Sequence, residues 1–123
     1  PLYSSAASDV YKRQGSTSGY INKFIYGTGA NNTVSGIGNN AGTKWQYIAS
    51  ASANSTSMNM DIYNPFLATQ TQFTCFVADT VYDSTSSYGM NGGAHSASTS
   101  YTGFTLLSGT AATGKVSIYG YAK

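Results

Sequence analysis

Side chains capable of acid–base, nucleophilic or metal chemistry are scarce along this 123-residue chain. Beyond residue 14 there are three Asp, no Glu, and one residue each of His and Cys, namely Asp61, Asp79, Asp83, His95 and Cys75. Hydrolytic sites need paired carboxylates or a nucleophile beside a base, and zinc sites need several His or Cys ligands. The sequence therefore predicts no enzyme, no catalytic residues, no metal centre and no cofactor. Hard oxygen ligands leave calcium at Asp79 and Asp83 as an alternative.

Aromatic side chains are the more abundant functional material, with 11 Tyr, 5 Phe and 1 Trp. Flat rings with polar tips suit protein interfaces and stack on sugar rings. The candidate ligand-binding residues are Trp45, Tyr82, Tyr88, Asn91 and His95. The alternative for each ring is an ordinary place in the core or in a cross-strand pair.

The charge pattern argues against two classes of partner. Charged residues make up only 8% of the chain, and no run of Lys or Arg could neutralise several phosphates. No apolar stretch approaches the roughly 20 residues that a membrane-spanning helix needs. We therefore expect neither nucleic-acid binding nor membrane insertion.

Cys75 is the single cysteine, so an internal disulfide is impossible. It lies within the apolar run of residues 73–77. This setting predicts a small buried hydrophobic residue rather than a reactive thiol.

The first 14 residues, PLYSSAASDVYKRQ, differ in composition from the rest and contain the only Arg. They resemble translated sequencing-adapter DNA found at the ends of reading frames from metagenome assemblies. We therefore expect residues 1–14 to be a foreign segment and residues 15–123 to form one domain. On this interpretation the domain lacks one or more N-terminal strands.

Short apolar runs alternate with Gly, Asn and Ser clusters, which is typical of an antiparallel sandwich or barrel. The predicted strands are 20–26, 33–37, 43–50, 58–63, 70–78, 88–91, 99–107 and 115–121. No sustained 3.6-residue apolar period occurs after Gly15. The predicted fold is all-β, an antiparallel β-sandwich resembling a jelly roll.

Alternation within these runs predicts which side chains face the core. Alternate residues from Tyr20 to Tyr26 share one face, and Met58, Met60 and Ile62 point inward. The continuous apolar run in 70–78 predicts a central strand covered on both faces.

Glycine-rich stretches predict the connections between strands. Residues 38–42 are expected to form a turn, and residues 92–98 a flexible segment. The last two strands are expected to pair with each other, with Val116 and Ile118 facing inward.

Four stretches in the C-terminal half carry a family resemblance. They are Met60-Asp-Ile-Tyr-Asn-Pro65, the apolar strand 71–78, Tyr101-Thr-Gly-Phe-Thr-Leu-Leu-Ser-Gly109 and Gly114-Lys-Val-Ser-Ile-Tyr-Gly-Tyr121. Together they resemble uncharacterised virion structural proteins of marine tailed phages. The resemblance covers roughly residues 19–123. The chain departs from the family pattern because it lacks the family's usual upstream strands.

This resemblance implies an oligomeric β-sandwich domain on the tail fibre, baseplate or head surface, with no catalytic residues to carry over. The expected function is that of a surface-exposed virion component, a tail-fibre or head-decoration protein. Its expected partners are copies of itself, other virion proteins and a host surface glycan. The alternative is a free, extracellular carbohydrate-binding β-sandwich module.

Overall fold

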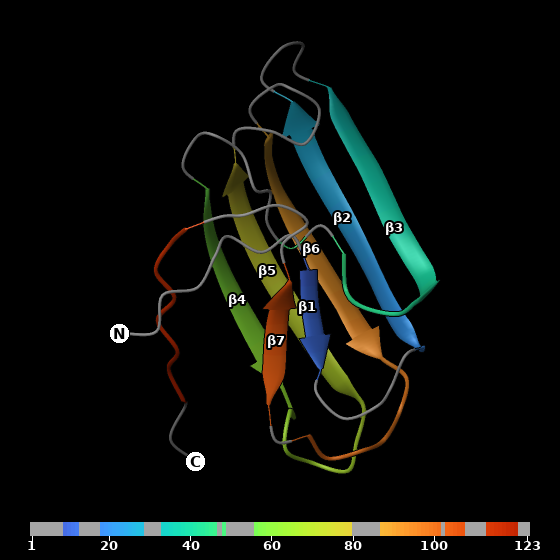
Figure 1. The fold of residues 1–123 in the computed structure, drawn as a ribbon. Coiled ribbons are helices and arrows are strands. Elements are labelled where there is room, and N and C mark those ends of the chain that lie inside the picture. The colour runs from blue at the N-terminus through green and yellow to red at the C-terminus, as the bar shows by residue number, and fades with distance from the viewer. Residues whose placement is uncertain are drawn as a thin grey trace.

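The computed structural model describes residues 9–12, 18–28, 33–46, 48, 56–79, 87–101, 103–107 and 113–120. Within them the regular structure consists of strands (Figure 1). The strands are β1 (Asp9–Lys12), β2 (Tyr20–Thr28), β3 (Val34–Gly42), β4 (Ser57–Tyr63), β5 (Thr71–Asp79), β6 (Ser87–His95) and β7 (Phe104–Leu107). These ranges contain no long apolar helix of the kind that crosses a membrane. The all-β prediction is confirmed for the described part of the chain.

Five strands form one antiparallel sheet in the order β3-β2-β6-β5-β4. Strands β1 and β7 form a separate antiparallel pair, which lies in front of this sheet in Figure 1. Leu106 of β7 packs against the hydrophobic core. The pair therefore contributes to the cover over one face of the sheet.

Side chains of alternate residues face this cover and form the core. Because strand side chains alternate between faces, the register aligns Phe24 of β2, Asn91 of β6 and Cys75 of β5 in one row across the sheet. Tyr20, Phe24, Phe73, Cys75 and Val77 are buried on this face. Met58, Met60 and Ile62 pack against them. The predicted alternation of residues 20–26 and the predicted inward face of 58–63 are confirmed, and the inward face of β2 is that of Tyr20 and Phe24.

Strand β6 lies at the centre of the sheet although it is rich in glycine. A Cβ atom on Gly89 would lie 2.6 Å from Cε2 of Phe24, and one on Gly93 would lie 2.8 Å from Cε1 of Phe73. The carbonyl oxygens of Ile25 and Ile21 on β2 and these two rings occupy the space that larger residues would need, which explains glycine inside a central strand. The prediction of a short strand at 88–91 and a flexible segment from residue 92 was wrong, because β6 continues to His95.

The chain between β3 and β4 joins the two edge strands of the sheet. Trp45 and Ile48 from this connection are fully buried in the core. The strand predicted at 43–50 is absent from the described residues 43–46 and 48. The apolar residues of this segment are buried because the connection packs on the face of the sheet, and not because the segment is a strand of the sheet.

Two other features differ from the prediction. The stretch 38–42 is part of β3, where Gly38 pairs with Lys23 of β2. Strand β5 is interior to the sheet but covered on one face, since Phe76 is 59% exposed.

The predicted pairing of the last two strands was also wrong. The strand expected at 99–107 is limited to β7, which pairs with β1. Residues 115–120 form no strand, and Ile118 is exposed, whereas Val116 is half-buried. Residues 9–12, inside the segment expected to be foreign, provide the strand that β7 pairs with.

Candidate functional site

The candidate ligand-binding residues do not converge on one surface. Trp45, Asn91 and His95 are at most 2% exposed, whereas Tyr88 is 63% exposed. Tyr82 lies outside the described residues. On β6, Tyr88 lies at an even position and Asn91 and His95 at odd positions, so the Tyr88 side chain points to the opposite face of the sheet. The structure thus corrects the prediction that Trp45, Asn91 and His95 offer polar and aromatic groups to a ligand.

Trp45 is an anchor of the core. Its ring meets Tyr20 edge-on with centroids 5.6 Å apart, and it packs on Phe73 at 4.6 Å. Its Nε1–H donates to the Ala94 carbonyl at 2.9 Å. A buried Trp usually finds such an acceptor, and this bond ties the connection after β3 to strand β6.

Asn91 forms a clamp with Asn22, and the clamp holds the backbone of Gln46. The Gln46 N–H donates to Oδ1 of Asn22 at 3.2 Å, and the Gln46 carbonyl accepts from Nδ2 of both asparagines, at 2.9 Å from Asn22 and 2.8 Å from Asn91. The Asn22 amide also donates to Oδ1 of Asn91 at 3.2 Å. Side-chain amides therefore replace a neighbouring strand as partners for the backbone N–H and carbonyl of Gln46, as buried backbone groups require.

His95 joins two segments of the chain, through the backbone of Ser18 and the side chain of Tyr101. One ring nitrogen, Nε2, lies 3.0 Å from the Ser18 carbonyl, and the other, Nδ1, lies 3.0 Å from the Tyr101 hydroxyl. Because a carbonyl can only accept, we assign the proton to Nε2, and Nδ1 then accepts from Tyr101. The described residues contain no group of three or more His, Cys, Asp or Glu that could hold a metal ion. This arrangement gives His95 a structural role.

Cys75 behaves as the sequence predicted. Its side chain is buried, and its Sγ lies 3.6 Å from the Ile48 carbonyl. Burial raises the pKa of the thiol to about 12, because the thiolate would lose its hydration. The reactive, ionised form is therefore suppressed at neutral pH.

The face of the sheet turned away from the core is the candidate functional surface. Ile25, Met90 and Phe76 lie side by side across β2, β6 and β5, and are 60%, 54% and 59% exposed. Tyr88 stands beside them on β6. We call these four residues the outer row. Tyr88, Met90, Phe76 and Asn59 also line a shallow depression of about 610 Å³.

The neighbouring row across this outer face carries charge at its two ends. It runs from Lys23 through Gly92 and Thr74 to Asp61. Lys23 Nζ donates to Oδ1 of Asn40 on the adjacent edge strand at 2.7 Å. The outer face is therefore apolar in its middle, with one cation toward β3 and one carboxylate on β4.

Sequence reasoning selected Tyr88 of the outer row but not Ile25, Met90 or Phe76. A signal was present, because in the segments 20–26 and 73–77 apolar residues occur at both odd and even positions, and therefore on both faces of each strand. Such a pattern indicates either a strand covered on both faces or a strand with an exposed apolar face. Only the packing distinguishes the two.

The described residues thus offer an apolar surface and a set of buried polar groups that hold the fold. Comparison with known proteins found no matching family model, no matching curated protein and no matching solved structure.

Proposed function

We propose that the protein is a non-enzymatic structural component of a phage particle, exposed on a tail fibre or head surface. The observation that carries this proposal is the outer row, because soluble monomers rarely expose contiguous apolar patches and larger patches mark interaction sites. The resemblance of the C-terminal half to virion proteins supplies the setting. The chain would act by joining other protein surfaces.

We also infer that the domain is a β-sandwich, with the β1–β7 pair and the connection after β3 in the second layer. Leu106, Trp45 and Ile48 support this arrangement, because they cover the buried face of the five-stranded sheet. A jelly-roll-like path is the form of sandwich that we propose.

The test is the composition of purified particles of a phage that encodes this chain. Immunogold labelling with an antibody to the chain should mark one fixed location on intact particles. Mass spectrometry should recover the chain in stoichiometric amounts after density-gradient purification. Presence in the infected-cell lysate together with absence from particles would overturn the proposal.

A glycan-binding role is the second candidate, and the exposure of Tyr88 beside the depression favours it. Exposed Tyr rings can stack on sugars, and with Trp45 buried, Tyr88 is the exposed candidate ring beside the depression. A glycan array should then show binding that Tyr88→Ala abolishes. Tyr119→Ala is the matched control, since Tyr119 is 85% exposed and lies outside the sheet. An array without binding would remove this candidate.

A further inference from the structure

We propose that the outer face is the contact surface of a symmetric homodimer, with the two-fold axis running along β6. The inference names a partner for the surface on which the proposed function rests. Dimerisation of the purified chain does not depend on a phage particle, so it and the particle assignment can fail separately.

The strand order makes the outer face complementary to itself. Because β6 is the central strand, rotation about an axis along it places β2 over β5 of the second copy. Ile25 of one copy then faces Phe76 of the other, and the two Met90 side chains meet at the axis. Each apolar member of the row meets an apolar partner.

The two charges select this axis over the other orientation. With the axis along β6, Lys23 lies over Thr74 of the second copy, one strand spacing of about 4.8 Å from its Asp61. Rotation about an axis across the strands would instead place β2 over β2 and β4 over β4, which leaves Lys23 three strand positions away from Asp61 of the second copy. Opposite charges across an interface favour the correct partner and orientation, whereas like charges exclude alternatives.

The dimensions of the face meet the requirement for a specific contact. A nine-residue strand is about 27 Å long and five strands are about 19 Å wide, which gives about 500 Å² per copy and about 1,000 Å² in total. This value is at the lower limit for specific interfaces. Gly92 and Gly27 carry no side chain on this face, which allows the two sheets to approach closely.

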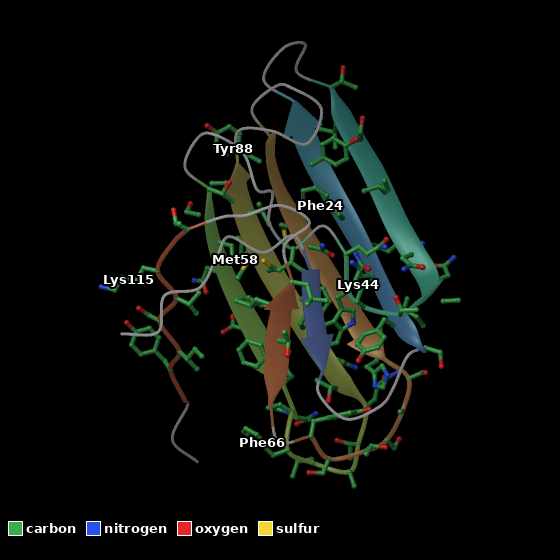
Figure 2. The ribbon with its side chains drawn as sticks, in the orientation of Figure 1. Phe24, Lys44, Met58, Phe66, Tyr88 and Lys115 are labelled. Carbon is green, nitrogen blue, oxygen red and sulfur yellow. The ribbon has the colours of Figure 1, made fainter. Side chains whose placement is uncertain are left out.

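Sedimentation equilibrium of the full chain tests the interface. We expect a monomer–dimer equilibrium whose dissociation constant rises at least about 30-fold in Phe76→Lys, as expected for loss of a central aromatic anchor. Phe66→Lys is the matched control, because Phe66 is 67% exposed and lies in the turn after β4, at the opposite end of the molecule from Tyr88 (Figure 2). Circular dichroism establishes that each variant is folded, and Met90→Lys replaces Phe76→Lys if the latter is not.

The orientation is tested with Lys23→Asp and Asp61→Lys. Each variant alone should dimerise more weakly than the wild type, because like charges then meet across the axis. An equimolar mixture of the two should form a heterodimer that is tighter than either homodimer. A wild-type chain that remains monomeric at all accessible concentrations, an equal effect of Phe66→Lys, or a mixture without heterodimer preference would each overturn the proposal.

Discussion

At the scale of single residues, the Cys75 thiol faces the core on β5, and burial raises its pKa from 9.0 to about 12. The unfolded chain ionises near pH 9 while the folded chain does not, so stability is full below pH 9 and falls as the pH rises toward 12. The loss is about 1.4 kcal/mol per pH unit. Cys75→Val removes this loss, and urea unfolding between pH 7 and pH 11 should show the difference in slope.

The comparison at pH 7 is the internal control for this prediction, because the Cys75 thiol is neutral there in both the folded and the unfolded wild-type chain. Other groups that titrate above pH 9 are common to the two proteins and cancel in the difference. Parallel pH profiles for wild type and Cys75→Val would contradict the assignment of a buried neutral thiol.

Two adjacent glycines of β6 provide a second test at this scale. A Cβ on Gly93 would collide with the Ile21 carbonyl oxygen of β2 and lie 2.8 Å from both Phe73 and Asn22 side-chain atoms, whereas a Cβ on Gly92 meets nothing closer than 3.6 Å. Gly93→Ala should therefore destabilise the fold by about 1–3 kcal/mol through overpacking. Gly92→Ala should be neutral or stabilise the fold by a few tenths of a kcal/mol to about 1 kcal/mol, because it lowers the entropy of the unfolded chain.

Thermal unfolding of the two variants measures this contrast directly. Equal effects of the two substitutions would show that Gly93 is not closely covered by β2 and the Phe73 ring as described.

At the scale of elements, the Asn22–Asn91 clamp attaches the connection after β3 to the sheet. Asn91→Ala removes one donor to the Gln46 carbonyl and one acceptor for Asn22, so it should cost about 1–3 kcal/mol. A double-mutant cycle with Asn22→Ala should give a coupling energy of about 0.5–3 kcal/mol, because the two side chains share partners.

Asn59→Ala is the control for the clamp, since Asn59 is an exposed residue of β4. Its effect should stay within about 0.5 kcal/mol. Additive effects of the Asn22 and Asn91 substitutions in chemical denaturation would show that the amides do not act together on Gln46.

The strands themselves illustrate which elements could be predicted. Alternation placed β2 and β4 within two residues of their bounds, because both bury one face. Strand β6 was predicted too short because its glycines have no side chains of their own to reveal the pattern. The segment 43–50 was predicted as a strand because its residues alternate along the sequence, but Trp45 and Ile48 are buried by packing on the sheet from outside.

At the scale of the whole molecule, the β1–β7 pair is separate from the five-stranded ladder. Deletion of residues 1–14 removes every ladder partner of β7 among the described residues and none of the partners of β2, β5 or β6. Hydrogen exchange should therefore show faster exchange of the β7 amides, with protection in the large sheet retained. Loss of protection throughout the sheet would show that the pair is required for the fold.

The candidate surface also belongs to this scale. The residue types in the sequence were sufficient to expect no paired carboxylates and no zinc ligands, because these depend on composition. They were also sufficient to expect strands, because strand alternation is local. Whether an apolar residue such as Ile25 or Phe76 is covered depends on whether another part of the fold packs on that face of the sheet. Local sequence does not determine this packing.

The sequence alone determined the all-β class, the alternation of residues 20–26, the inward face of 58–63 and the buried state of Cys75, since each follows from local pattern. Tertiary structure decided that Trp45, Asn91 and His95 serve the interior and that Ile25, Met90, Phe76 and Tyr88 face outward. The physical reason is that an aromatic or amide side chain suits a core or a binding surface equally well. The neighbours brought by strands distant in the sequence determine which of the two it occupies.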